Sequence, residues 1–272
     1  MKTQLQPYEE YPEQRKGQPV LEAFIDALSW EEALSRITNW ASARESRYVC
    51  ICNAHSVVTT TQDIEFKIAV NNADMATPDG APIAWALRRL GHPDQERING
   101  PDLMLKYLAA AQRLNHRVFF YGSTENTLEL LRAALAKQFP GLRICGTYSP
   151  PFRPLMREED DRIVEMINRS GANVVFIGLG CPKQEKWMAE HRGRIKAVMI
   201  GVGAAFDYHA GVVKRAPVSW QRYGMEWLYR LANEPRRLFK RYMVTNTLFI
   251  VGFTRQVILR RFAVQEVESV VD

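Results

Sequence analysis

The sequence predicts an α/β fold, in which a Rossmann-like, mostly parallel sheet is flanked by helices and followed by a basic helical C-terminal appendage. Three observations lead to this prediction. Short apolar segments alternate with segments of helical periodicity, as in repeated β-α-β units. Glycine or polar turns follow several apolar segments, at the strand ends where such sheets bind ligands. Basic and aromatic residues become frequent from Lys214 onward, in a chain of otherwise ordinary globular composition.

Each element is predicted from its local pattern. In chain order the prediction is a flexible leader at 1–20, a helix at 21–43, a strand at 48–53, a helix at 63–71, a loop at 76–80, helices at 81–90 and 103–114, a strand at 117–121, a helix at 125–139, a strand at 142–147, a helix at 160–170, a strand at 173–177, a helix at 184–191 and a strand at 197–200. Helices are assigned where apolar residues recur every three or four positions, and strands where a short apolar run is bounded by polar or turn residues. The leader is polar, and Pro78 and Gly80 mark the loop.

These elements predict three regions. Residues 1–20 are the leader, residues 21–216 an α/β catalytic domain, and residues 217–272 a basic amphipathic helical tail that binds a membrane or an acceptor. The longest apolar stretch of the tail, residues 243–259, is interrupted by polar side chains. Because a spanning helix needs roughly 20 apolar residues, this stretch is expected to lie on a membrane and not to cross it.

Charge is unevenly distributed along the chain. The whole chain has 36 Lys and Arg against 30 Asp and Glu, a net charge of +6. From Lys214 to Arg261, eleven basic residues stand against Glu226 and Glu234, so this segment carries +9 and the remainder −3. Such a tail is attracted to phosphate, whether in lipid headgroups, nucleic acid or a pyrophosphate-bearing substrate.

Glycine turns close three of the predicted strands. Gly178 and Gly180 follow one strand, Gly201 and Gly203 follow another, and Gly122 ends a third. Backbone N–H groups in such turns can bind phosphate at a helix N-terminus. Neither pair completes the dinucleotide-binding fingerprint, which disfavours an NAD-dependent oxidoreductase. Tight strand-helix turns without a ligand remain an alternative for both pairs.

Polar residues near these turns are candidates for chemistry. Asp79 stands in a loop where a carboxylate can be a general base, although Asp before Gly is also common turn chemistry. Lys183 and Gln184 follow Pro182 at a predicted helix start, where Lys can bind phosphate and Gln a sugar, unless this turn is only solvated. Asn53, after a buried strand, can bind sugar hydroxyls.

No metal or other cofactor is expected. The chain lacks an Asp-x-Asp pattern, with which many sugar-nucleotide enzymes hold a divalent cation. Cationic side chains such as Arg97, together with backbone N–H groups, would then neutralise a leaving diphosphate. The four cysteines lack metal-binding spacing and are expected to be free thiols in a reducing cytoplasm.

The tail interleaves aromatic and basic side chains. Trp220, Tyr223 and Trp227 alternate with Arg222 and Arg230. This mixture suits a membrane interface or stacked bases, so a nucleic-acid-binding protein is an alternative function. A C-terminal helix that packs on the core and has a solvated basic face is the third interpretation.

Several ordered blocks resemble the WecG/TagA/CpsF family of glycosyltransferases over roughly residues 21–243. The blocks are Asn53-Ala-His-Ser-Val-Val58, Pro78-Asp-Gly80, Arg97-Ile-Asn-Gly-Pro-Asp-Leu103, Gly178-Leu-Gly-Cys-Pro-Lys-Gln-Glu185, Gly201-Val-Gly-Ala-Ala-Phe-Asp207, Lys214-Arg-Ala-Pro217 and Glu226-Trp-Leu-Tyr-Arg230. The resemblance implies an inverting transferase that moves a sugar from a UDP-sugar to a saccharide on a polyprenyl diphosphate, in cell-surface or exopolysaccharide synthesis.

The resemblance also implies roles for individual residues. Asp79 would be the general base, Gln184 the active-site glutamine and Asn53 the asparagine beside the donor. The nucleotide- and donor-binding set, which includes the glycine turns, would be Arg97, Gly122, Gly178, Gly180, Lys183, Gly201, Gly203 and Asp207. The tail arginines that close over the site and contact the acceptor and the membrane would be Arg230, Arg237 and Arg241.

The chain departs from the family pattern at one position. Members often have Thr two residues before the asparagine matched by Asn53, and this chain has Ile51. A hydroxyl contact to substrate would be missing, so the sugar preference of other members does not transfer. The expected partners are a UDP-sugar, a lipid-diphosphate-linked sugar and an anionic membrane surface, with no nucleic acid and a possible homo-oligomer. The expected location is cytoplasmic and peripheral, on the inner face of a bacterial cell membrane.

Overall fold

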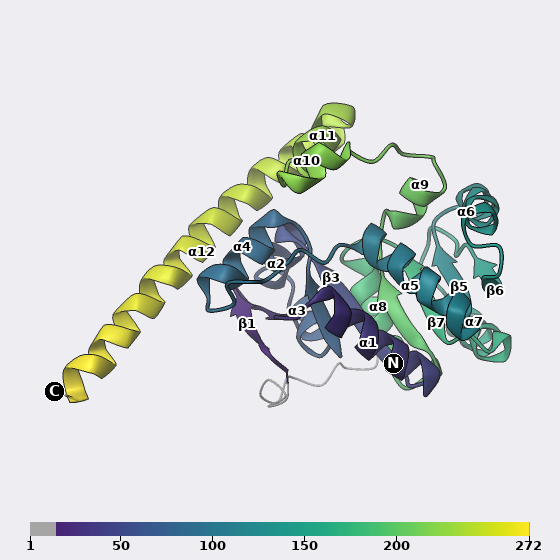
Figure 1. Cartoon of the computed structure of the whole chain (residues 1–272), viewed down its shortest axis with the longest axis horizontal. Helices are drawn as coiled ribbons and strands as arrows, with labels where there is room; N and C mark the ends of the chain where they lie inside the picture. The colour runs from purple at the N-terminus through teal and green to yellow at the C-terminus, as the bar shows by residue number, and fades with distance from the viewer. Residues whose placement is uncertain (1–14, 272) are drawn as a thin grey trace.

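The computed structural model of the chain describes residues 15–271. At its centre is a six-stranded sheet in which every neighbouring pair of strands is parallel. The strand order is β4-β3-β8-β7-β5-β6 (Figure 1). The strands are β3 (Arg47–Cys52), β4 (Met75–Pro78), β5 (Arg117–Gly122), β6 (Arg143–Tyr148), β7 (Val174–Gly178) and β8 (Val198–Gly201). The predicted parallel α/β sheet is confirmed.

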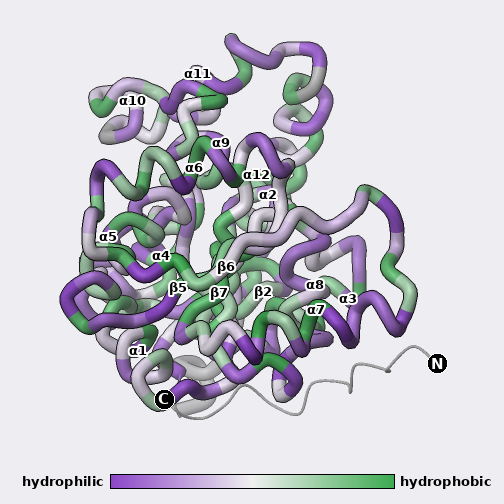
Figure 2. Tube along the Cα trace, turned by 90° about the vertical axis from the view of Figure 1, so that its right-hand side faces the viewer, coloured by the Kyte–Doolittle hydropathy of each residue, from purple (hydrophilic) through white to green (hydrophobic). Residues whose placement is uncertain are grey.

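Helices cover both faces of this sheet. One face is covered by α1 (Trp30–Ser42), α5 (Gly100–Leu114), α6 (Glu125–Gln138) and α9 (Ala205–His209). The other is covered by α2 (Ala54–Thr60), α3 (Ile64–Asn71), α4 (Ala81–Arg89), α7 (Arg157–Ser170) and α8 (Lys183–His191). Successive strand residues divide between two cores, as Phe176 and Ile177 of β7 do. The inner strands β3, β8, β7 and β5 are accordingly mostly apolar. Figure 2 shows hydrophobic residues in the middle of the molecule.

An antiparallel hairpin precedes α1 and corrects two sequence predictions. β1 (Gly17–Val20) pairs with β2 (Ala23–Asp26), where the end of the leader and the start of a helix were expected. Residues 1–14 of the predicted leader lie outside the described residues. The two strands are short and β1 contains Pro19. Their alternation of apolar and polar residues is therefore too brief to distinguish β1 from a polar leader or β2 from the start of a helix.

Asp26 joins this hairpin to the sheet. Its carboxylate is fully buried and accepts hydrogen bonds from Arg15 and, at 2.6 Å, from the N–H of Ala76 in β4. A buried carboxylate needs such partners because its desolvation is costly. Helix α1 then begins at Trp30, after Ser29, whose side chain caps the helix and completes a capping box with Glu32.

β4 corrects the loop that was predicted over 76–80. Met75–Pro78 is a strand, and only Asp79 and Gly80 belong to the turn that follows it. Proline is tolerated here because β4 is at the edge of the sheet, with a strand neighbour on one side only. Asp79 therefore lies at the carboxyl end of a strand.

The chain ends in three helices, α10 (Val218–Arg222), α11 (Glu226–Asn233) and α12 (Pro235–Val271). α12 runs past the body as a long rod, with α10 and α11 at its beginning (Figure 1). Phe249 and Phe253 are buried in the core on the α2 side of the sheet. Gln256 accepts a hydrogen bond from the N–H of Leu21 at 2.9 Å and donates one to the Pro19 carbonyl at 2.7 Å. Within residues 15–271, α12 included, no helix combines the length and the hydropathy of a membrane span.

Candidate active site

Candidate residues gather at the ends of four adjacent strands. β4, β3, β8 and β7 are consecutive in the sheet. Asp79 follows β4, Asn53 follows β3, and Gly201 and Gly178 end β8 and β7. The N–H of Asp79 donates to the carbonyl of Cys52 at 2.9 Å, which joins the first two of these strand ends. The sequence prediction that polar groups meet at one edge of the sheet is therefore met by the structure.

Asp79 is a largely buried carboxylate beside an arginine. Its side chain is 21% exposed, and Arg97 Nε lies 3.4 Å from Asp79 Oδ1. Burial raises the pKa of Asp79; Arg97 opposes this effect, and the nearby carboxylate of Glu226 adds to it. A carboxylate with a raised pKa at a strand end has the chemistry of a general base.

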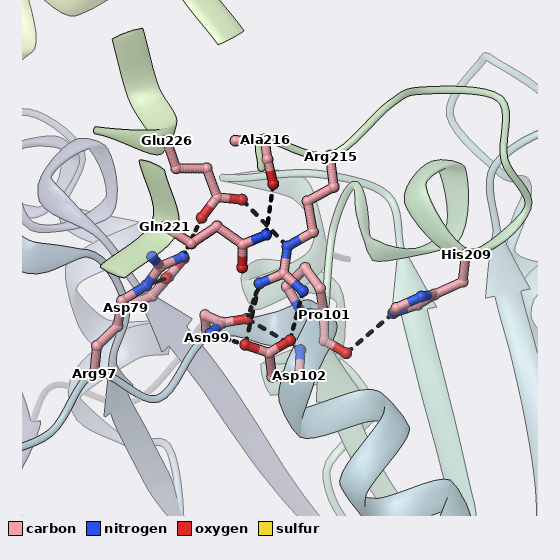
Figure 3. Close-up of polar contacts among 10 residues, drawn as sticks. All are labelled: Asp79, Arg97, Asn99, Pro101, Asp102, His209, Arg215, Ala216, Gln221 and Glu226. Atoms are coloured by element: carbon pink, nitrogen blue, oxygen red, sulfur yellow. Dashed lines mark hydrogen bonds and ion pairs between the residues drawn. The ribbon is translucent and has the colours of Figure 1, made fainter. Parts of the chain in front are cut away.

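Charged side chains alternate in sign from Asp79 to the start of α5 (Figure 3). Arg97 Nη2 donates to Glu226 Oε2 at 2.5 Å, and Arg215 Nε donates to Glu226 Oε1 at 3.4 Å. Arg215 also donates to both carboxylate oxygens of Asp102, at 2.5 and 3.1 Å. Most of these side chains are largely buried, so solvent and salt screen their interactions less than those of surface ion pairs.

Gln184 is held in place beside the turn after β8. Its Oε1 accepts from the N–H of Gly203 at 3.1 Å, and its Nε2 donates to Glu185 Oε1 at 2.9 Å. Glu185 is 1% exposed, and burial raises its pKa to about 7. Its second oxygen has no hydrogen-bond partner among residues 15–271. The Gln184 amide therefore keeps one lone pair and one N–H for a ligand.

The glycines of the strand ends are of two kinds. A Cβ atom on Gly122 would lie 2.6 Å from the backbone of Gly178, and one on Gly178 would lie 2.7 Å from the ring of Phe206. Gly201 is similarly confined. Close packing therefore explains why these three positions are glycine, in agreement with the alternative that the turns are tight without binding a ligand. Gly180 differs, because its φ is 78° and no atom lies within 4 Å of its Cβ position, so its backbone is open to a ligand.

Asn53 is the N-cap of α2. Its Oδ1 accepts hydrogen bonds from the N–H groups of His55 and Ser56, at 3.0 and 3.2 Å. Because capping uses the oxygen, the amide nitrogen is the group that remains for a sugar hydroxyl. Ile51 lies two residues earlier in β3 and is buried in the core on the α5 side.

Of two further predicted ligands, Lys183 follows β7 and Asp207 lies beside the end of β5. Lys183 is the first residue of α8 and is exposed, without a hydrogen bond or ion pair to the part of the chain that the structure describes. Asp207 lies in α9 and accepts a hydrogen bond from Ser123 Oγ at 3.5 Å, directly after β5. Asp207 is thus next to the end of β5 and not next to Asp79.

The tail arginines reach different parts of the site. Arg230 of α11 lies over the ring of Tyr208 at 5.8 Å, and its buried Nε has no hydrogen-bond partner within the described chain. Arg241 of α12 is exposed; burial and then the charge of Arg241 lower the pKa of His55, so Arg241 is near α2. The side chain of Arg237 lies outside the described residues.

Sequence reasoning assigned no role to two residues that the structure places in the site. Glu226 begins α11 and Arg215 precedes α10, and together they connect the tail to Arg97. Glu226 lies 129 residues from Arg97 in the sequence, so no local spacing reveals the contact. The signal that could have found them is the pair of blocks over 214–217 and 226–230, which resemble the family and in which the sequence analysis gave a role to Arg230 alone.

A family model and a curated protein both match this chain. A sequence model described as the Glycosyl transferase WecG/TagA/CpsF family matches residues 18–263. A protein of Bacillus spizizenii (strain ATCC 23059 / NRRL B-14472 / W23), named N-acetylglucosaminyldiphosphoundecaprenol N-acetyl-beta-D-mannosaminyltransferase, is 34% identical over 212 residues. That match covers 75% of this chain and 80% of the relative.

Proposed function

This chain belongs to the WecG/TagA/CpsF glycosyltransferase family, and we propose that it moves a sugar from a UDP-sugar to a saccharide on a polyprenyl diphosphate, with inversion at the anomeric carbon. The relative's name supports the acceptor class, because it specifies a diphosphoundecaprenol-linked N-acetylglucosamine. The same name makes an N-acetylmannosaminyl donor the first to test. Ile51 is the reason to test other donors beside it.

The arginines of the site are the proposed binding groups for the donor diphosphate. Arg97, Arg215 and Arg230 bring three positive charges to the ends of the strands. Preorganised cations stabilise the charge that develops on a leaving diphosphate, most strongly where water is excluded. We therefore propose a metal-independent transfer. The open backbone of Gly180 and the exposed Lys183 are further phosphate contacts in this proposal.

Asp79 is the proposed general base. The acceptor hydroxyl oxygen bonds to the anomeric carbon while its proton moves to an Asp79 oxygen. The bond between that carbon and the UDP oxygen breaks, and its electron pair leaves with UDP. Attack from the face opposite UDP inverts the configuration. Gln184 and Asn53 would orient the sugar through the amide groups that the protein leaves available.

The tail is the proposed contact to the membrane that carries the acceptor. Arg241 and the exposed apolar residues of α12 would face an anionic surface, while Arg230 faces the site. This arrangement suits a peripheral enzyme on the inner face of a cell membrane, acting in cell-surface or exopolysaccharide synthesis. Assembly into a homo-oligomer is compatible with the proposal and is not needed for it.

One observation carries the catalytic proposal: a carboxylate with a raised pKa, Asp79, lies at a strand end beside the arginine cluster. The test is product analysis by mass spectrometry, with a synthetic lipid-diphosphate N-acetylglucosamine and a panel of UDP-mannosaminyl, UDP-mannosaminuronyl and UDP-glucosyl donors. We expect one donor to give product, and Asp79→Asn to fold normally and to lose about 10²- to 10⁴-fold in turnover.

The matched control is Asp161→Asn, which removes an exposed carboxylate of α7 that pairs with Arg194 and with no residue of the proposed site. It should transfer sugar at the wild-type rate. Full activity of Asp79→Asn would exclude Asp79 as the base. Thermal stabilisation by NAD or by DNA, with none by UDP or any UDP-sugar, would exclude the proposed reaction altogether.

A further inference from the structure

One carboxylate of the tail bridges two arginines of the site. Glu226 accepts a hydrogen bond from Arg97 through one oxygen and from Arg215 through the other (Figure 3). Its side chain is 12% exposed, so both contacts are shielded from solvent. Glu226 is the first residue of α11. Among the described residues, no other carboxylate pairs with both Arg97 and Arg215.

Arg97 is therefore shared unequally between two carboxylates. Its Nη2 lies 2.5 Å from Glu226, whereas its Nε lies 3.4 Å from Asp79. The guanidinium has five N–H groups and forms its strongest pairs as a bidentate fork with one carboxylate. Without Glu226, Asp79 would be the remaining carboxylate partner of Arg97 in the described structure, and the two would be free to pair fully.

We propose that Glu226 is a positioning residue, which draws Arg97 away from full pairing with Asp79 and so leaves the Asp79 carboxylate able to accept the acceptor's proton. The inference rests on the proposed function of Asp79 as the base. A base that is locked in a bidentate ion pair is a weaker proton acceptor, because protonation would break the pair. Since Glu226 belongs to α11, the base is freed only when the tail is docked.

The charges around Asp79 support this arrangement. The charged groups that face it are Arg97, from the segment before α5, and Glu226 and Arg230, both from α11. Burial has the largest effect and raises the pKa of Asp79; among the charges, the two arginines lower this pKa and Glu226 raises it. Removing the Glu226 charge lowers that pKa directly, and releasing Arg97 onto Asp79 lowers it again, so both effects have the same sign.

The experiment is a titration of Asp79 in the full chain, followed by ¹³C NMR of labelled aspartate carboxyls, with the Asp79 signal assigned by its loss in Asp79→Asn. In Glu226→Gln, the Asp79 midpoint should fall by about 1 pH unit, the size of effect that one charge at 4–6 Å produces. The acid limb of kcat/KM, measured with the donor that gives product in the panel above, should move to lower pH with it, and the plateau rate should fall.

Two variants separate positioning from simple docking of the tail. Glu226→Asp keeps the charge on a shorter side chain, so its shift should have the same direction and a smaller size. Glu165→Gln removes a carboxylate from an exposed helical ion pair and should leave the Asp79 titration unchanged. If Glu226→Gln does not fold, Glu226→Asp alone carries the test.

An unchanged or raised Asp79 midpoint in both Glu226 variants would overturn the inference, and so would a lower kcat or higher KM with a fixed acid limb. Failure of the proposed function looks different. In that case Asp79→Asn remains active, or no donor gives product, whatever the carboxylate at position 226 does to the titration.

Discussion

Asp79 and Glu185 are two carboxyls with raised pKa values and different surroundings. Burial raises the pKa of both carboxyls. Asp79 is partly exposed and faces Arg97, whereas Glu185 is 1% exposed and, among residues 15–271, is hydrogen-bonded to the side chain of Gln184 alone. A base must reach its substrate, and of these two carboxylates Asp79 is the more exposed, which is why it is the proposed base. Glu185 instead holds the Gln184 amide in one orientation, which makes it part of the support of the site.

Glu185→Gln should remove a pH dependence of stability. The ordinary Glu pKa is 4.5 and that of Glu185 is about 7, so the unfolded chain loses its proton first as pH rises. The free energy of unfolding of the wild type should therefore fall by about 3 kcal/mol as pH rises from the ordinary Glu pKa to the pKa of Glu185, because of the shift of this one group. Above the pKa of Glu185 it should level off. Glutamine is neutral, keeps the oxygen that accepts from Gln184, and has no such loss.

The measurement is urea unfolding of both proteins at pH 4.5, 6 and 8. Other titrating groups are common to the two proteins and cancel in the difference. Relative to the wild type, Glu185→Gln should gain stability as pH rises over this interval. A difference that does not change with pH would show that Glu185 does not carry the titration.

At the scale of elements, the tail is attached to the body at several separate points. Gly224, between α10 and α11, approaches Ala81 at the start of α4, two residues after Asp79. Gln256 of α12 is hydrogen-bonded to Pro19 of β1 and to Leu21 in the hairpin turn. The contact of Gly224 with Ala81 sets how close α11 lies to α4, and the hydrogen bonds of Gln256 hold the C-terminal half of α12 against the hairpin. Small changes at the first point should therefore alter catalysis while the tail stays attached.

Gly224→Ala should lower sugar transfer, with a loss of stability no larger than the backbone strain of about 1–2 kcal/mol. Gly224 has a φ of 71°, and an added Cβ would lie 2.6 Å from the Cβ of Ala81, so α10 and α11 must move away from α4. A displacement of this kind misplaces Glu226 and Arg230, and misplacement by about 1 Å can cost 10²-fold in rate. Transfer rate and thermal unfolding midpoint are the two quantities to measure.

Gly193→Ala is the matched control for this change. Gly193 also has a positive φ, 85°, but no atom lies within 4 Å of its Cβ position. Backbone strain of about 1–2 kcal/mol is expected in both variants, so strain alone cannot separate them. Equal transfer rates for Gly224→Ala and Gly193→Ala would show that contact with α4 does not position the tail.

For the whole molecule, sequence predicts best what local patterns encode. The strand predicted at 117–121 is β5, Arg117–Gly122, because a run of apolar residues bounded by turns is typical of a strand buried on both faces. The hairpin and β4 were missed because Pro19 and Pro78 lie in short strands. Proline cannot donate a backbone hydrogen bond, and it is tolerated in a strand at the edge of a sheet. Their pairing depends on contacts distant in sequence.

The site follows the same division. Asn53 and Gln184 could be chosen from the sequence because they follow predicted strands, and Asp79 because it stands in a predicted loop; the structure brings the turns after β3 and β4 together. The contacts of Glu226 and Arg215 could not be derived, because ion pairs across more than 100 residues leave no periodic trace. That Asn53 caps α2 was also hidden, since that helix was not predicted.

The amphipathic character of α12 leads to a prediction for the whole chain at a membrane. Its buried face is Leu238, Thr245, Phe249 and Phe253, whereas Phe239, Met243 and Ile250 are 57, 56 and 63% exposed on another face. Residues 242–254 contain no charged side chain, and basic residues stand on both sides of them. An interfacial helix combines these features, because apolar side chains enter the acyl boundary while basic ones, at about 1 kcal/mol each, pair with anionic headgroups.

Replacing Phe239, Met243 and Ile250 by Ser should therefore reduce sedimentation with phosphatidylcholine–phosphatidylglycerol vesicles, while the buried face keeps α12 in place. The matched control is Phe152→Ser, which removes an aromatic side chain that is 91% exposed but lies outside the tail. The control should sediment like the wild type. High salt should weaken binding of the wild type only in part, because the apolar contribution is not screened. If the triple variant and the control sediment alike at every salt concentration, α12 does not bind the membrane through its exposed apolar face, and the acceptor lipid must be reached through another surface.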